Sequence, residues 1–147
     1  MQPTDVVLLA EDSEDDRFLI RRAFRKAGVN NRIIEAFDGQ DAISYLEGEG
    51  KYADRAQHPL PCVIITDLKM PRVDGFGLLR WLQEHHEFQR VPKLVLSSSD
   101  EPRDRDQASR LGACGYFVKA GSVSELVQVV SEINEDWISD HCPLVQG

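Results

Sequence analysis

Acidic, hydroxyl and amino side chains occur in this sequence directly at the ends of short apolar runs. The set consists of Glu11, Asp12, Asp67, Ser97 and Lys119. Short apolar runs are typical of strands buried on both faces, and the carboxyl ends of such parallel strands form the edge where α/β sheets bind ligands. One acidic residue after a strand is usually a helix cap. The complete set at one edge indicates a functional site.

The chemistry of this set favours a divalent cation and phosphate. Three neighbouring carboxylates repel one another, and one would be driven towards protonation unless a cation neutralised the group. Mg²⁺ prefers oxygen ligands and keeps some waters, so carboxylates with a backbone carbonyl suit it. Such an ion would align a phosphoryl group with an aspartate nucleophile, while Lys119 and Ser97 would contact the phosphoryl oxygens. The pattern predicts a Mg²⁺ site that receives phosphate.

The rest of the sequence supplies the elements that would position this site. Apolar runs predict strands at residues 6–10, 32–37, 62–66, 94–99 and 116–118. Helical spacing and cap residues predict helices within 13–28, 39–48, 75–82, 102–112 and 123–138. Strands that alternate with helices imply right-handed βαβ units. The predicted fold class is therefore α/β, with three layers and a doubly wound, five-stranded parallel sheet covered by helices on both faces.

Two segments carry more specific expectations. In the first predicted helix, Ser13 is placed as the N-cap with Asp16 three residues later, a variant of the capping box. The apolar residues that recur at helical spacing are Phe18, Leu19, Ala23, Phe24 and Ala27. Residues 49–61 contain Gly, Pro and charged residues without an apolar period. They predict a long loop with room for one helical turn, and such loops tend to be functional or mobile.

Composition limits the classes of function. The 147 residues suit a single domain with a core at about 6–138, a short C-terminal tail and no output domain. With 25 acidic and 17 basic residues, the formal net charge of -8 argues against nucleic-acid binding. The sequence lacks a membrane-length apolar stretch and the regions of a signal peptide. Its three cysteines have no metal-ligand spacing, and their odd number argues against a disulfide framework. A cytoplasmic protein is expected.

Four segments resemble the receiver domains of bacterial response regulators, and the resemblance extends over about residues 6–137. The segments are LLAEDS at 8–13, IITDLKMPRVDG at 64–75, LVLSS at 94–98 and GYFVK at 115–119. The resemblance implies a flavodoxin-like, chemotaxis-type fold with strand order 2-1-3-4-5. It also implies that Asp67 is the phosphoacceptor. Asp12, Asp67 and the backbone carbonyl of Lys69 would bind Mg²⁺, and Glu11 would assist through water.

The same resemblance implies a switch and a partner. Ser97 would be the hydroxyl that moves towards the phosphoryl group, Tyr116 the aromatic residue that follows it, and Lys119 the contact to phosphate. The phosphoryl donor would be a sensor histidine kinase or a phosphotransfer protein, and the output a protein contact. Residues 49–61 and 81–92 resemble, more loosely, stand-alone receivers of which some partner phytochrome-type histidine kinases. The apolar surface of the last helix would allow a homodimer.

One departure from the family leaves alternatives open. Ala120 follows Lys119 where receivers normally have a proline in a cis peptide. A cis bond before a non-proline residue costs about 3–4 kcal/mol, so the Lys119–Ala120 bond is predicted to be trans. A trans bond could impair switching, which leaves open a phosphate-independent adaptor, or pseudo-receiver.

An enzyme is the other alternative, a Mg²⁺-dependent phosphatase with Asp67 as covalent nucleophile. Such enzymes usually place a second aspartate two residues after the nucleophile, where this chain has Lys69. We therefore expect no enzymatic activity beyond assistance to the chain's own phosphotransfer and autodephosphorylation.

Overall fold

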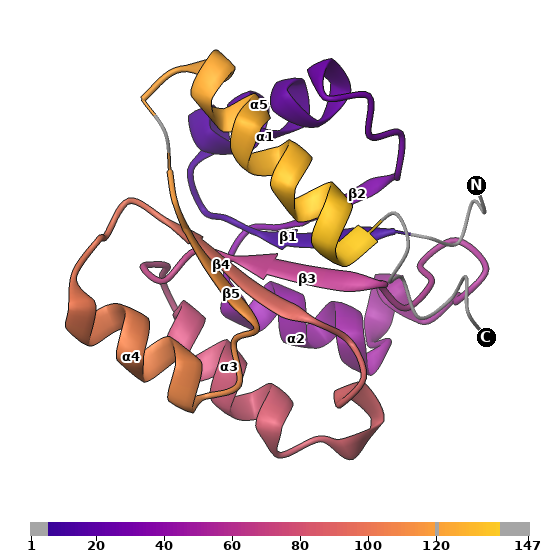
Figure 1. Ribbon diagram of the computed structural model, residues 1–147. Coiled ribbons are helices and arrows are strands. Elements are labelled where there is room, and N and C mark those ends of the chain that lie inside the picture. Colours follow the sequence, from indigo (N-terminus) through magenta and orange to yellow (C-terminus); the bar gives the residue numbers. More distant parts are fainter. Residues whose placement is uncertain (1–5, 120, 139–147) are drawn as a thin grey trace.

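A parallel sheet is the frame of the molecule. The computed structural model describes residues 6–119 and 121–138. The strands are β1 (Val7–Ala10), β2 (Ile33–Ala36), β3 (Val63–Thr66), β4 (Lys93–Ser97) and β5 (Gly115–Val118). All pairs are parallel and the order is β2-β1-β3-β4-β5, which confirms the predicted class and topology (Figure 1). After β1 the chain adds β2 on one side, and after β3 it adds β4 on the other side, so the strand order reverses between β1 and β3. The crevice in which such sheets bind ligands is therefore expected at the carboxyl ends of these two strands.

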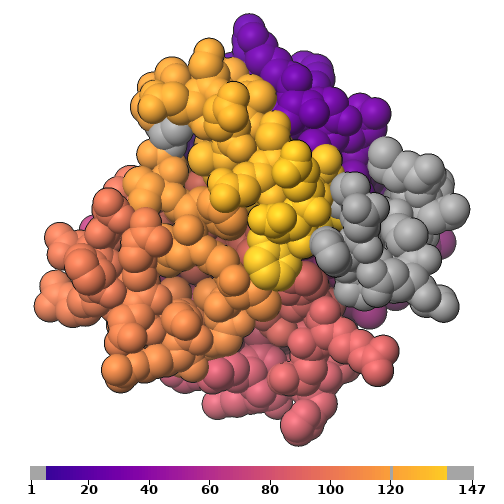
Figure 2. Space-filling model, in the orientation of Figure 1, coloured from indigo at the N-terminus to yellow at the C-terminus, as the bar shows by residue number. Residues whose placement is uncertain are grey.

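Helices cover both faces of the sheet. They are α1 (Glu14–Lys26), α2 (Gly39–Glu47), α3 (Gly75–Gln83), α4 (Pro102–Arg110) and α5 (Val123–Ile133). Helices α1 and α5 pack on one face, and α2, α3 and α4 on the other (Figure 1). Seen in space-filling form, α5 and α4 flank the edge strand β5 (Figure 2).

The burial of the strands explains their apolar sequences. Every residue of β1, β3 and β4 is buried, because these central strands have helices on both faces. The edge strands β2 and β5 are only partly buried. One charged side chain, that of Lys93 at the start of β4, is also buried.

Side-chain caps fix where four of the helices begin. Oxygens of Ser13, Asp38, Asp74 and Ser122 accept hydrogen bonds from backbone N–H groups three residues later. Such caps satisfy donors that have no partner within the helix. The predicted cap at Ser13 is therefore confirmed. Each of these helices follows a parallel strand and so begins on the carboxyl side of the sheet.

The buried stripe of α1 contains only part of the apolar residues that recur at helical spacing. Ile20, Ala23 and Phe24 are buried, but Phe18 is 51% and Leu19 is 37% exposed. Phe18 and Leu19 thus share the helical spacing of the apolar residues but not the buried stripe. Only a narrow face of α1 packs against the sheet and α5, so apolar residues at the sides of that face remain exposed to solvent.

The loop after α2 is packed against the end of that helix. It contains the expected short turn, a 3₁₀ helix at Gly50–Tyr52. Arg55 donates hydrogen bonds to the carbonyls of Tyr45 (2.9 Å) and Leu46 (2.7 Å), and the Tyr45 hydroxyl donates to the Pro59 carbonyl (2.7 Å). These contacts tie the loop to the last turn of α2.

The C-terminal helical segment extends through the predicted range to Ile138, the last residue that the structure describes. Helix α5 continues as a π-helical turn at Asn134–Ile138, and Trp137 packs against the core between α1, α5 and the sheet. The predicted trans geometry of Lys119–Ala120 and the expected tail after Ile138 lie outside the described residues. Among the described helices, none has the length and apolarity that a membrane span requires.

Candidate functional site

Strand register brings the predicted residues to one rim of the sheet. Ala10 of β1 pairs with Thr66 of β3, so the next residues, Glu11 and Asp67, are neighbours, and the Asp67 N–H donates to the Ala10 carbonyl (3.0 Å). On the other side, the N–H of Lys119 donates to the carbonyl of Ser97, the last residue of β4 (2.7 Å). Backbone pairing alone therefore aligns both pairs of residues at the carboxyl edge.

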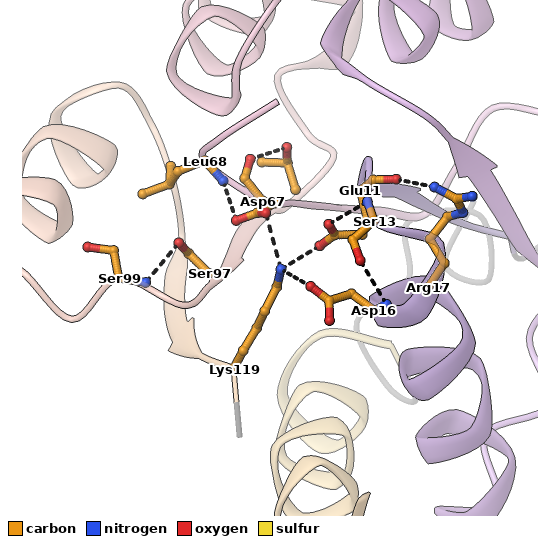
Figure 3. Close-up of polar contacts among 10 residues, drawn as sticks. Glu11, Ser13, Asp16, Arg17, Asp67, Leu68, Ser97, Ser99 and Lys119 are labelled. Atoms are coloured by element: carbon orange, nitrogen blue, oxygen red, sulfur yellow. Dashed lines mark hydrogen bonds and ion pairs between the residues drawn. The ribbon is translucent and has the colours of Figure 1, made fainter. Parts of the chain in front are cut away.

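The ammonium of Lys119 is the centre of the site. Its Nζ lies 2.8 Å from Glu11 Oε1, 2.7 Å from Asp16 Oδ2 and 3.1 Å from Asp67 Oδ2 (Figure 3). The side chain of Lys119 is only 15% exposed and that of Glu11 is 2% exposed. Since solvent screens these charges poorly, the lysine is the principal counter-charge for the carboxylates around it.

Burial and charge shift two pKa values at this rim. Burial raises the pKa of Glu11; the hydrogen bond from Lys119 opposes the shift and the charge of Asp67 adds to it, so the pKa lies above its ordinary value. Burial would lower the pKa of Lys119, but its hydrogen bonds to Asp16 and Glu11 and the charge of Asp67 outweigh that effect and raise it. Lys119 is thus firmly protonated, whereas burial and, to a smaller extent, the charge of Asp67 disfavour the ionised form of Glu11.

Three carboxylates at the rim fit a metal ion. Oxygens of Glu11, Asp12 and Asp67 all lie within 4.8 Å of one another. Glu11 and Asp67 are buried, while Asp12 faces solvent and leaves the site open to water. Hard oxygen donors with an open side suit Mg²⁺, which retains part of its hydration shell. Lys69 lies two residues beyond Asp67 in the loop that follows β3, and the role of its carbonyl stays a prediction.

The carboxylate of Asp67 is held by different donors at its two oxygens. Oδ1 accepts a hydrogen bond from the Leu68 N–H (2.7 Å), and Oδ2 faces Lys119. The neighbouring Thr66 hydroxyl donates to the Asp67 carbonyl (2.8 Å). The side chain is therefore oriented before any ligand binds.

Ser97 and Tyr116 are joined through one residue, Ser99. The Ser97 Oγ, which is buried, accepts a hydrogen bond from the Ser99 N–H (3.1 Å). The Tyr116 hydroxyl donates to the Ser99 carbonyl (2.8 Å), and the guanidinium of Arg105 on α4 lies 4.7 Å from the centre of the Tyr116 ring. A displacement of the Ser97 hydroxyl would therefore act on the hydrogen bond that holds Tyr116.

The sequence analysis missed two residues of this arrangement. Asp16 was interpreted only as part of a cap, and its N–H does bind Ser13 Oγ (3.2 Å), but its carboxylate binds Lys119. Because α1 begins at the rim, an acidic residue in its first turn was a usable signal. The bridging role of Ser99 depends on its backbone groups, so no residue type could have indicated it.

The fold and this site agree with a known family. The sequence model of the response regulator receiver domain matches residues 7–131. The chain therefore belongs to the receiver domain family of two-component signalling.

Particular relatives cover nearly the whole chain. The probable methanogenesis regulatory protein FilR2 of Methanothrix harundinacea is 32% identical over 136 residues, which span 90% of this chain and 83% of that protein. Response regulator Rcp1 of Synechocystis is 28% identical, with coverage of 92% of this chain and 90% of its own.

Solved structures give the same result. The phosphorylated cyanobacterial phytochrome response regulator RcpA has a TM-score of 0.83 at 32% identity, over 92% of this chain and 94% of its own. The Mn²⁺-bound form of Rcp1 has a TM-score of 0.80 at 27% identity, over 92% and 96%. Phytochrome response regulators are thus among the structures that this chain resembles.

Proposed function

We propose that this chain is a phospho-receiver in which Asp67 accepts a phosphoryl group from a phosphohistidine on a sensor histidine kinase or phosphotransfer protein. One observation carries the proposal: oxygens of Glu11, Asp12 and Asp67 converge within 4.8 Å while Lys119 Nζ contacts Asp67 at 3.1 Å. Clustered carboxylates with a single ammonium suit a divalent cation and an incoming phosphoryl group. They have no comparable use as helix caps.

Each residue has a defined part in the transfer. A carboxylate oxygen of Asp67 attacks phosphorus, the bond from phosphorus to the donor imidazole breaks, and the imidazole leaves with the bonding electrons. Asp12, Asp67 and the Lys69 carbonyl would hold Mg²⁺, with Glu11 bound through water. When bound, the ion neutralises negative charge between the carboxylates and the phosphoryl oxygens. Lys119 supplies a second positive charge from the opposite side.

The signal would leave through Ser97 and Tyr116. A phosphoryl oxygen on Asp67 offers the Ser97 hydroxyl a strong, charged acceptor. Ser97 Oγ also receives the Ser99 N–H, and the Ser99 carbonyl receives the Tyr116 hydroxyl. Movement of Ser97 would therefore reach the surface beside β5 and α4, where a protein partner can detect it.

The relatives support this assignment and a class of partner. RcpA was solved in a phosphorylated form and Rcp1 with bound Mn²⁺, an ion whose oxygen-ligand preference resembles that of Mg²⁺. RcpA is also named as a phytochrome response regulator. A phytochrome-type histidine kinase is accordingly the donor class that we propose.

Labelling by a small phosphoryl donor tests the function. With Mg²⁺ and acetyl phosphate the wild type should gain one phosphoryl group by intact-mass analysis, and Asp67→Asn should gain none, because an amide is a poor nucleophile. Asp74→Asn is a matched control, since asparagine retains the oxygen that caps α3. Labelling of Asp67→Asn at the wild-type level would refute the assignment.

The two alternatives have separate tests. A phosphatase would turn over a generic phosphate ester, but the position of its usual second aspartate is occupied by Lys69. An adaptor that ignores phosphate would bind its partner equally with and without modification of Asp67.

A further inference from the structure

The loop from Leu68 to Asp74 joins the proposed acceptor to α3 and contains Lys69. Its backbone is fixed at both ends: the Gly75 N–H donates to the Leu68 carbonyl (2.9 Å), and the Gly39 N–H of α2 donates to the Val73 carbonyl (2.9 Å). The second bond is notable because α2 follows β2, which is not adjacent to β3 in the sheet. The start of α2 therefore constrains the loop that follows Asp67.

Glycines permit this close approach. A Cβ at Gly39 would collide with the Val73 carbonyl oxygen, and a Cβ at Gly75 would collide with the carbonyl oxygen of Asp67. The loop is thus in backbone contact with Asp67 on one side and with α2 on the other. A shift of the loop cannot be absorbed by side chains alone.

An ion pair reinforces this contact. Arg72 donates to Asp38 through Nε (2.6 Å to Oδ2) and Nη2 (3.0 Å to Oδ1), while the Asp41 N–H also donates to Oδ1 (2.8 Å). The side chain of Asp38 is 8% exposed and that of Arg72 is 62% exposed. Burial would raise the pKa of Asp38, but the bonds from Arg72 and the Asp41 N–H outweigh it and lower the pKa. The arginine fork, formed by Nε and Nη2 of Arg72, therefore binds a charged, nearly buried carboxylate.

The backbone of Arg72 shows that the pair constrains the loop. Its φ of 65° is the only positive value at a non-glycine residue in the described part of the chain. Left-handed geometry is disfavoured for residues with a Cβ, and glycine is the residue that usually adopts it. The local backbone conformation does not favour an arginine at this position. The two hydrogen bonds to Asp38 are the stabilising contact that an arginine provides here.

We propose that Asp38 and Arg72 are a positioning pair that holds residues 68–74 so that the Lys69 carbonyl meets the carboxylate rim, and that the pair thereby sets the affinity for Mg²⁺. Neither side chain touches the ion. The inference rests on the proposed function, because it assumes Lys69 as a ligand. Groups that orient metal ligands typically change affinity about 10- to 100-fold when they are removed.

Two variants separate positioning from folding. Asp38→Ser keeps an oxygen that can cap α2 but removes the acceptor of the arginine fork. Arg72→Gly removes the fork and relaxes the backbone, since glycine accepts a positive φ. Each should weaken Mg²⁺ binding, measured by isothermal titration calorimetry, by about tenfold or more. The double variant should bind no more weakly than either single one, because both break the same contact.

The controls distinguish the ways in which this idea can fail. Arg110→Ala removes an exposed arginine paired with Asp106 on α4 and should leave Mg²⁺ affinity unchanged. Unfolding by urea in EDTA reports stability without metal. Lower stability with unchanged Mg²⁺ affinity in Asp38→Ser and Arg72→Gly would mean that the pair only fastens α2, and would overturn the inference. Failure of the wild type to bind Mg²⁺, or binding that survives Asp12→Ala unchanged, would overturn the proposed metal site and the inference with it.

Discussion

At the scale of single residues, the rim balances four carboxylates against one ammonium. Lys119 contacts Glu11, Asp16 and Asp67, while Asp12 completes the group of oxygens that could bind a cation. A Mg²⁺ ion bound at the rim would neutralise the same negative charge as Lys119. Each should therefore reduce the benefit that the fold gains from the other.

Replacement of Lys119 by methionine tests this balance. In EDTA, Lys119→Met should lower the free energy of unfolding by about 2–3 kcal/mol, below the range for fully buried pairs because Asp16 is partly exposed. Added Mg²⁺ should then stabilise the variant more than it stabilises the wild type, as urea unfolding with and without Mg²⁺ would show. Lys119→Arg keeps the charge and should resemble the wild type. An equal gain from Mg²⁺ in all three proteins would contradict the shared-charge interpretation.

Residue types and their positions after strands predicted which carboxylates would meet Lys119 at one rim, because parallel strands end at the same edge of the sheet. They did not predict Asp16, whose orientation depends on the phase of α1, or the fork between Arg72 and Asp38. Arg72 follows a proline in a segment that resembles a turn, and its partner is 34 residues away. Such pairs depend on how two loops pack, and no periodicity in the sequence encodes this.

At the scale of elements, β4 carries a charge inside the protein. Lys93 begins the strand and is 8% exposed, and its Nζ donates to the carbonyl of Phe88 (2.7 Å) in the short 3₁₀ helix His86–Phe88. Burial lowers the pKa of Lys93. The charged form is therefore less favourable in the folded protein than in the unfolded chain.

This shift predicts a pH dependence of stability. Between the lowered folded pKa and the ordinary value of 10.5, the unfolded chain binds more protons at Lys93, so this group's contribution to the free energy of unfolding rises with pH. Lys93→Met removes that dependence. The stability of the variant relative to the wild type should thus be highest at neutral pH and decline as the pH approaches 10.5. Urea unfolding from pH 7 to 10.5 measures it, and a constant difference would show that burial does not shift Lys93.

Buried elements were predicted more accurately than exposed ones. Continuous apolar runs marked β1, β3 and β4 because both faces of these strands are covered. In α1, Phe18 and Leu19 lie in solvent although their spacing is helical. Apolar residues at a helix surface follow the same period as the core, so spacing alone cannot separate them.

At the scale of the whole molecule, a chain of contacts crosses from the rim to α4. Ser97 accepts from Ser99, Ser99 accepts from Tyr116, and Arg105 covers the Tyr116 ring. Beryllofluoride, a phosphoryl mimic, with Mg²⁺ should therefore shift amide NMR signals from Asp67 to β5 and α4. Tyr116→Phe lacks the hydroxyl that reaches Ser99.

In Tyr116→Phe we expect the shifts near Asp67 and Ser97 to persist and those in β5 and α4 to fall by about half, since the variant loses the hydrogen bond from Tyr116 to Ser99 but keeps the backbone pairing of β4 with β5. Wild-type shifts throughout the variant would show that another route couples the rim to α4. Shifts confined to the rim in the wild type would favour the phosphate-independent adaptor.

The alternation of strands and helices was sufficient for the fold class, because parallel strands need crossovers and helices provide them. Alternation does not determine strand order, and the order 2-1-3-4-5 came from the resemblance to receivers. Which strands pair with β1 depends on how the helices and the faces of the sheet pack together, and this is a property of the assembled core.

The contact between Lys119 and Asp16 joins residues 103 positions apart. During synthesis, a ribosome-bound chain would expose Asp12, Asp67 and Ser97 well before Lys119 emerges. Long-range contacts of this kind form late, since the entropy of closing so large a loop must be offset by the rest of the structure. The proposed acceptor, Asp67, should thus become chemically competent only when β5 is in place. Nascent or partly degraded chains would then not divert phosphoryl groups from the signalling pathway.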